Sequence, residues 1–415
     1  MLTQLPTNSS QTGKAGPELR VVAIGGGTGL STLLKGLKGY VLSPALAPFG
    51  QPIIRELVGV VTVSDDGGSS GRLRKEFNML PPGDVRNCIV ALSEDEALLS
   101  RLFQHRFQKG SGLEGHSFGN LFLAALTSIT GDFAEAVRLS SEILLTRGRI
   151  FPATMSSVEL EALFVDGARV RGETRITASK GKIQELVLVP PDVEPLPQTL
   201  EAIASADLIT IGPGSLFTSL IPNLLVRGIP EAILESRAVK VFVCNLMTQA
   251  NESLGLSAAD HIRALNHHAG VQLFDHALIN RKPASPEMKA KYALEEASQV
   301  VVDLTAIRAL GVRPLLGDYL EEGAVVRHAT DRVAHDLVIR ATDVGVCPNQ
   351  LIPRVLHEWR EPRHPEFQPR TVWSLFNSFT EALKQGNLAE LLKRTEALHG
   401  LLDGYVGLGN RFSQS

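Results

Sequence analysis

The sequence predicts a three-layer α/β protein, in which helices cover both faces of a parallel sheet. Short, mostly apolar runs rich in β-branched residues recur along the chain at 21–24, 57–63, 208–211 and 239–244. Strands that helices cover on both faces are apolar in this continuous way. Segments with apolar residues at helical spacing follow such runs, for example at 30–37 and 261–268. Alternating strands and helices are typical of parallel sheets with crossover helices.

Further elements are expected from the same patterns. We predict helices at 84–92, 96–107 and 119–128, and strands at 271–279 and 300–304.

Two regions depart from the alternation of strands and helices. Asp166-Gly167 separates two weakly alternating runs, which predicts a hairpin. Beyond about residue 345, leucines recur at helical spacing between Leu388 and Leu402. We therefore expect a disordered tail at 1–18, a main domain at 19–345 with a small antiparallel insertion at 149–190, and a helical C-terminal extension at 346–415.

Composition limits the classes of function. The chain has 415 residues and a formal net charge of −3, without the basic balance of most nucleic-acid-binding proteins. Its three cysteines, Cys88, Cys244 and Cys347, form no pair at metal-binding or disulfide spacing. The N-terminus has no apolar segment of a secretory signal, and no stretch has the composition of a membrane span. These features favour a soluble cytoplasmic protein.

The first candidate site is the run Gly25-Gly26-Gly27-Thr28-Gly29 between a strand and a helix. Glycines let backbone N–H groups approach an anion, and the following helix directs its positive end to the same point. No Gly-Lys-Ser/Thr follows, and Leu30 breaks the dinucleotide-binding fingerprint. A phosphate or diphosphate site is predicted, with an unliganded tight turn as the alternative.

The second candidate site follows the next strand. Asp65 and Asp66 could hold Mg²⁺ or sugar hydroxyls, whereas Ser69 and Ser70 could contact phosphate. Ligands of open α/β sheets bind at the carboxyl ends of the strands, so both loops point to one crevice. The alternative is that the Asp-Asp-Gly-Gly run only caps a turn.

Other polar loops lie at predicted helix starts and strand ends. Asp84 is a candidate N-cap, and Arg86 could pair with a phosphate or with Asp84 or Asp65. The remaining candidates are Asn87, His116, Asn120, the run Gly212-Pro213-Gly214-Ser215, Asn245 and Thr248. His116 alone is more typical of a structural histidine. No nucleophile elbow or zinc-protease motif is present, so no catalytic residue is assigned. Together these loops predict binding of a phosphorylated small molecule.

The motifs also resemble a known family. GGGTGLSTLLKGLK, VTVSDDGGSSGRLRKEF, PPGDVRN, GHSFGNLFLAALTSITGDF, IGPGSLFTSLIPNLLV and VCNLMTQ occur in the order seen in YvcK-like proteins. These proteins form the gluconeogenesis factor branch of the 2-phospho-L-lactate transferase (CofD) superfamily, and the resemblance covers about residues 20–340. It implies a Rossmann-like sheet, a nucleotide-binding domain at 19–345, binding of UDP-N-acetylglucosamine, and a role in cell shape and cell-wall homeostasis during gluconeogenic growth.

The resemblance also assigns residues to the ligand. It implies that Tyr292 stacks on the base and that Arg327 grips the diphosphate, beside the glycine loops, Asp65, Asp66 and Asn120. The branch implies a non-catalytic regulator without a cofactor. Two alternatives stay open: a transferase of phosphorus-containing groups with Mg²⁺ at Asp65 or Asp66, and a scaffold with a vestigial cleft. The ligand is expected to be a nucleotide sugar, with no nucleic acid and no membrane insertion; homo-oligomerisation and protein partners stay open.

Overall fold

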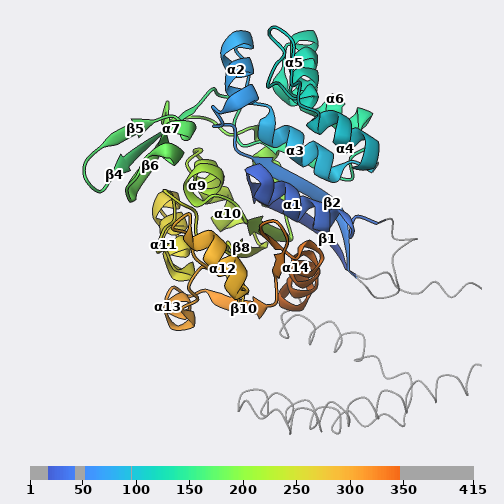
Figure 1. Cartoon of the computed structure of the whole chain (residues 1–415). Helices are drawn as coiled ribbons and strands as arrows, with labels where there is room; N and C mark the ends of the chain where they lie inside the picture. Colours follow the sequence, from blue (N-terminus) through green and yellow to red (C-terminus); the bar gives the residue numbers. More distant parts are fainter. Residues whose placement is uncertain (1–16, 43–51, 95, 346–415) are drawn as a thin grey trace, which may run out of the picture. The chain divides into compact units, whose positions relative to one another are not determined.

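A seven-stranded parallel sheet forms the framework of the computed structural model, which describes residues 17–42, 52–94 and 96–345 (Figure 1). The strand order is β10-β9-β8-β7-β1-β2-β3. Its strands are β1 (Glu18–Gly25), β2 (Ile53–Val61), β3 (Arg149–Pro152), β7 (Leu208–Ile211), β8 (Val239–Val243), β9 (His276–Asn280) and β10 (Arg313–Gly317). The apolar runs of the central strands are buried, as their composition predicts.

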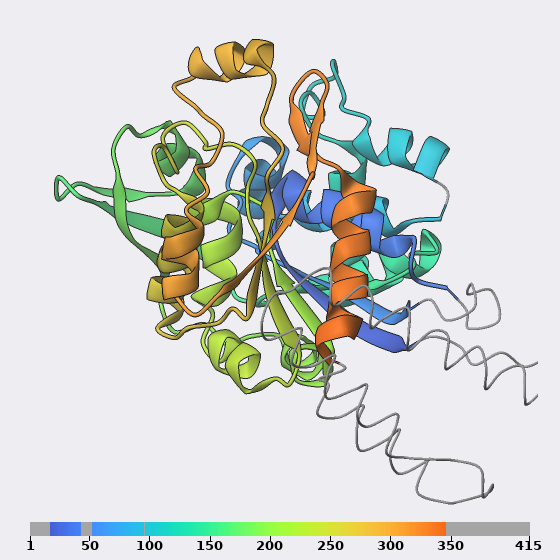
Figure 2. The same cartoon turned by 90° about the horizontal axis from the view of Figure 1, so that it is seen from below.

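Helices cover both faces of this sheet. On one face α1 (Gly27–Lys38) packs against α3 (Gly83–Leu92) and α14 (Thr330–Gly345). On the other face α9 (Ile221–Leu224) packs against α10 (Ile229–Glu235) and α11 (Ala258–Ala269), as seen from below in Figure 2. The other helical segments are α2 (Gly68–Phe77), α4 (Glu96–Gln104), α5 (Phe118–Thr130), α6 (Phe133–Ile143), α8 (Pro197–Ser205), the π-helix η1 (Leu216–Leu220), α12 (Pro286–Ala293) and α13 (Leu304–Ala309). The predicted three-layer arrangement is therefore confirmed.

A small antiparallel sheet stands beside the main one (Figure 1). Its order is β5-β4-β6, with β4 (Glu159–Phe164), β5 (Arg169–Arg171) and β6 (Ile183–Val189), and α7 (Glu173–Ala178) lies between β5 and β6. The Asp166-Gly167 turn joins β4 to β5, as its residues predict. Residues 149–152 differ from the expected insertion, because they pair with β2 as parallel strand β3.

Two elements near the end of the described chain depart from the prediction. The expected strand at 300–304 is wrong: Asp303 is the N-cap of α13, and its carboxylate accepts a hydrogen bond from the Ala306 N–H at 3.0 Å. A two-stranded hairpin of β11 (Leu320–Glu322) and β12 (Val326–His328) had no clear signal in the sequence. Three-residue strands are too short for alternation to identify them.

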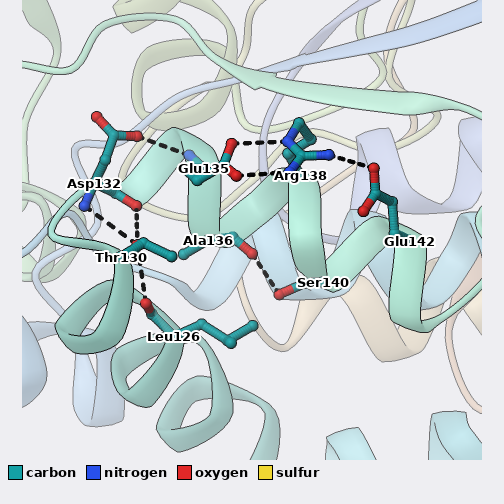
Figure 3. Close-up of polar contacts among 8 residues, drawn as sticks. All are labelled: Leu126, Thr130, Asp132, Glu135, Ala136, Arg138, Ser140 and Glu142. Atoms are coloured by element: carbon teal, nitrogen blue, oxygen red, sulfur yellow. Dashed lines mark hydrogen bonds and ion pairs between the residues drawn. The ribbon is translucent and has the colours of Figure 1, made fainter.

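The hairpin of α5 and α6 illustrates how local chemistry sets element ends (Figure 3). Asp132 is the N-cap of α6 and accepts from the Glu135 N–H at 2.7 Å. Along the exposed face, Arg138 pairs with Glu135 and with Glu142, three and four residues away. These contacts stabilise a helix that sequence reasoning had not identified.

The chain divides after Gly345. The predicted helical extension at 346–415, Cys347 and nearly all of the expected tail at 1–18 lie outside the described residues. Cys88 and Cys244 are free and buried, in keeping with their expected role as small apolar residues. Among the described helices, none has the length and apolar composition needed to span a bilayer.

Candidate functional site

The candidate site lies where the strand order of the main sheet reverses. From β1 the chain continues outward to β2 and β3, then returns to β7 on the other side of β1 and continues to β8, β9 and β10. The loops after β1 and β7 therefore leave the sheet in opposite directions. A crevice at the carboxyl ends of the strands is the usual ligand position at such a switch point.

The two glycine loops contact each other at this point. A Cβ atom on Gly29 would lie 2.2 Å from the carbonyl oxygen of Pro213 and 2.9 Å from Cα of Gly214. Gly27 has φ of +60°, a left-handed conformation that suits glycine. The glycines are thus required for close approach of two backbones, as well as for any approach of a ligand.

Asn245 holds the second glycine loop. Its Oδ1 accepts from the Gly214 N–H at 3.1 Å, and its Nδ2 donates to the Gly214 carbonyl at 2.7 Å. The Ser215 hydroxyl accepts from Nε2 of Gln249 at 2.9 Å. Thr248 does not contact this loop through its hydroxyl, which donates to the Ser298 carbonyl and accepts from the Ser298 N–H. Asn245 therefore shapes the crevice, while Thr248 ties down the following loop.

An internal carboxylate faces the first glycine loop. Asp84 accepts a hydrogen bond from the Gly27 N–H, and burial, followed by the nearby Asp65 charge, raises the pKa of Asp84 to about 6. The expectation that Asp84 caps α3 is wrong, because Pro82 occupies the N-cap and Asp84 lies in the first turn. Asp84 instead fills part of the anion-binding end of α1. A ligand phosphate at this point must share the loop with a carboxyl group.

The two aspartates after β2 have local structural partners. Asp65 accepts from the Gly67 N–H at 2.8 Å, which is the turn contact considered as the alternative. Asp66 accepts from the backbone N–H and the hydroxyl of Thr174 at 2.9 and 2.6 Å. Asp66 thereby links the loop after β2 to α7 of the antiparallel sheet. Both carboxylates lie in loops at the crevice, and each already accepts a hydrogen bond from the protein.

Glu173 is a site residue that sequence reasoning missed. Burial, with additional repulsion from Asp65, Asp84, Asp66 and Glu252, raises the pKa of Glu173 to about 9. Its Oε2 atom is buried without a hydrogen-bond partner in the described part of the protein. At neutral pH Glu173 is consequently a neutral carboxylic acid that can donate a hydrogen bond.

No metal site is preassembled from these acids. Within residues 17–42, 52–94 and 96–345, no three His, Cys, Asp or Glu side chains converge as ligands of one ion. A cation that enters with a bound diphosphate could still reduce the repulsion among the clustered carboxylates, since Mg²⁺ commonly bridges phosphates and one or two carboxylates.

Ser69, His116 and Asn120 form a buried polar cluster beside the loop after β2. The Ser69 hydroxyl is 2.9 Å from Nδ1 of His116 and accepts from Nδ2 of Asn120 at 3.1 Å. Burial lowers the pKa of His116. This arrangement joins α2 to the start of α5 and gives His116 the structural role considered for it.

Arg86 extends the cluster from α3. Its guanidinium donates to the hydroxyl of Ser117 and, at 3.1 and 2.7 Å, to the side-chain oxygens of Asn120 and Asn87. Its Nε is buried without a partner among the described residues. Ser70 is also buried, with its hydroxyl close to Gly83. Arg86 therefore links α3 to the start of α5, and its Nε is the one donor atom without a partner among the described residues.

Glu252 caps the π-helix that follows the second glycine loop. Its Oε1 accepts from the N–H groups of Phe217 and Thr218 at 2.8 and 3.0 Å. Burial raises the pKa of Glu252, and these hydrogen bonds oppose that shift. The carboxylate comes from the loop after β8, so nothing in the local sequence around Phe217 signals it.

The β11–β12 hairpin reaches the carboxyl end of β8. Nε2 of His328 lies 3.1 Å from the carbonyl oxygen of Cys244, and burial lowers the pKa of His328 to about 4. The adjacent Arg327 is exposed. Tyr292 is partly buried, and its hydroxyl accepts from the Val326 N–H at 3.0 Å. Tyr292 thus supports the strand that carries Arg327.

The predicted residues therefore fall into three groups. The glycine loops, Asn245, Asp65 and Asp66 surround the switch point, together with Asp84 and with Glu173, which only the tertiary structure identifies; Glu252 holds the start of the π-helix that follows the second glycine loop. The second group is the buried network of Ser69, Arg86, Asn87, His116 and Asn120. Tyr292 and Arg327 form the third, on the side of the crevice toward β8.

Comparisons with known proteins identify the family of this chain. The family model described as 2-phospho-L-lactate transferase CofD matches residues 21–320. The gluconeogenesis factor of Halalkalibacterium halodurans is 50% identical over 320 residues, covering 77% of this chain and 95% of that protein. The gluconeogenesis factor of Bacillus subtilis is 46% identical over 324 residues, covering 78% of this chain and 98% of that protein.

A solved structure extends the similarity to the fold. An X-ray structure of a Bacillus halodurans protein matches with a TM-score of 0.73 and 48% identity, covering 77% of this chain and 99% of that one. The switch-point crevice, the glycine loops and these relatives lead to one conclusion: the chain belongs to the 2-phospho-L-lactate transferase CofD family and, within it, to the gluconeogenesis factor group.

Proposed function

We propose that this protein is a non-catalytic regulator that binds UDP-N-acetylglucosamine in the crevice at the switch point and acts in cell shape and cell-wall homeostasis during gluconeogenic growth. The observation that carries the proposal is the contact between the two glycine loops, where Gly29 and Pro213 bring two strand-to-helix turns together. Such turns present backbone N–H groups to phosphate oxygens.

The charges around the crevice are consistent with a sugar nucleotide. Asp84 and Glu252 already occupy N–H groups of α1 and η1, so the diphosphate needs further donors. The exposed guanidinium of Arg327 can supply charged hydrogen bonds to it. A neutral Glu173 can donate to a sugar hydroxyl or to an acetamide oxygen without repelling the phosphates.

The test is calorimetric titration of the full chain with UDP-N-acetylglucosamine, with and without Mg²⁺, and with GDP as the control. Saturable binding of the UDP-sugar without Mg²⁺ and without turnover supports the proposal. If only GDP binds, and only with Mg²⁺, the proposal fails.

One observation favours a second candidate, a Mg²⁺-dependent transferase. Asp65, Asp66, Asp84 and Glu173 repel one another in the crevice, and a divalent cation would relieve that repulsion. This candidate requires transfer of a phosphorus-containing group from a nucleotide donor. Incubation with a guanylated donor, analysed by ³¹P NMR with and without Mg²⁺, distinguishes it: product formed only with Mg²⁺ supports a transferase.

A further inference from the structure

We propose that the groove between the antiparallel sheet and α11 is a second binding site, for a small organic anion with an apolar part. A cavity of about 500 Å³ lies there. The segment between α7 and β6 lines one side, α11 the other, and the loop after β8 and Phe217 of η1 complete the wall. Protein pockets that bind small molecules typically have volumes of about 300–1,000 Å³, so the cavity can hold a metabolite.

The cavity is separate from the switch-point crevice. None of the residues of the two glycine loops is among its described lining residues. Phe217 and Glu252 line the cavity, and Glu252 also holds the first N–H groups of η1. The π-helix that follows Gly212–Ser215 thus stands between the two spaces, with Glu252 in the cavity wall.

A direct hydrogen bond joins α11 to the antiparallel sheet beside the cavity. Nε2 of His268 accepts from the Leu186 N–H of β6 at 3.0 Å, so Nδ1 carries the proton and donates to the Ala264 carbonyl at 2.8 Å. Burial lowers the pKa of His268, which keeps the ring neutral. Along α11, His267 is exposed, whereas His268 is partly buried against the antiparallel sheet. A fixed wall reduces the ordering cost of binding.

The lining carries three cationic and three anionic side chains, which differ in how they are paired. Lys180 and Lys182 are exposed, line the cavity and form no ion pair within the described residues. Arg263 is paired with Asp260 at 2.6 Å, so those two charges offset each other. The other two carboxylates are Glu252, which accepts from backbone N–H groups of η1, and Glu296.

The apolar lining defines the rest of the ligand. Phe217 is buried, and Leu254 and Leu256 lie on the same lining. Two lysines at the edge and an aromatic ring with leucines inside suit a phosphate or carboxylate joined to a ring or short carbon chain. Inorganic phosphate alone would use only the lysines.

The experiment uses phenyl phosphate as the probe, with inorganic phosphate beside it, in ligand-observed NMR titrations of the full chain. The test variant is Lys180→Glu/Lys182→Glu, and the matched control is Lys109→Glu/Arg308→Glu, which changes the net charge equally at exposed positions outside the cavity. We expect saturable binding of phenyl phosphate with Kd near ~1 mM or tighter, and weaker binding of inorganic phosphate. The test variant should lose at least ~10-fold in affinity, about 1.4 kcal/mol, while the control keeps it.

Two results would overturn the proposal. One is wild-type protein that shows no saturation at millimolar probe; the other is equal affinity in the test and control variants. Arg327→Ala reports on the crevice separately: if that variant alone loses the probe, phenyl phosphate binds at the switch point and the second site is refuted. Melting temperatures of all variants verify that they are folded.

Discussion

Replacement of Glu173 by Gln tests the crowding of acids in the crevice. The pKa of Glu173 is raised from 4.5 to about 9, so the folded state keeps a proton that the unfolded chain loses above about pH 4.5. The free energy of unfolding of the wild type therefore falls by about 1.4 kcal/mol for each pH unit between these values. Between about pH 5 and pH 8 this amounts to about 4 kcal/mol, three units at that slope. Glutamine has nearly the same shape and no charge, so the variant lacks this loss.

The assay is urea denaturation of both proteins at several pH values. We expect similar stabilities near pH 5 and an increasing advantage of Glu173→Gln toward pH 8. Glu201→Gln, at an exposed position of α8, is the control and should follow the wild type at every pH. Parallel stability profiles of wild type and Glu173→Gln would refute the claim that Glu173 stays protonated.

Three further substitutions test the crevice itself. Arg327→Ala should weaken binding of UDP-N-acetylglucosamine by about 1–3 kcal/mol in calorimetry, with the melting temperature nearly unchanged because the side chain is exposed; unchanged affinity would remove it from the site. Glu252→Ala leaves two buried N–H groups without their acceptor and should lower stability by about 1–3 kcal/mol for each, measured by denaturation, whereas Glu252→Gln keeps an acceptor and should cost less. Gly29→Ala forces a Cβ to within 2.2 Å of the Pro213 oxygen, so it should separate the loops, cost about 1–3 kcal/mol and reduce ligand affinity. Gly323→Ala, where a Cβ would meet its nearest neighbour only at 3.9 Å, is the control, and equal behaviour of the two alanine variants would contradict the role of loop contact.

Periodicity identified the long and strongly patterned elements. The apolar runs at 21–24 and 208–211 lie in β1 and β7, and the helical spacing at 261–268 lies in α11. A buried strand is apolar throughout and an amphipathic helix is apolar along one face, so both patterns can be recognised in the sequence. The same reasoning missed β11, β12 and α6, which are short or defined by caps, and it misread residues 300–304, where Asp303 starts a helix. Strand β3 was assigned to the wrong sheet because four residues do not reveal their partner.

The sequence by itself determined the parallel α/β fold and the glycine-rich, polar loops at the ends of its strands, because these properties depend on local spacing and residue type. Only the tertiary structure decided which residues occupy the crevice together. Asp84, Glu173 and Glu252 come from α3, α7 and the loop after β8. Burial is the main cause that raises the pKa of each, and repulsion from nearby carboxylates adds to the shift for Asp84 and Glu173. Such proximity depends on how distant segments pack, and no local pattern in the chain encodes it.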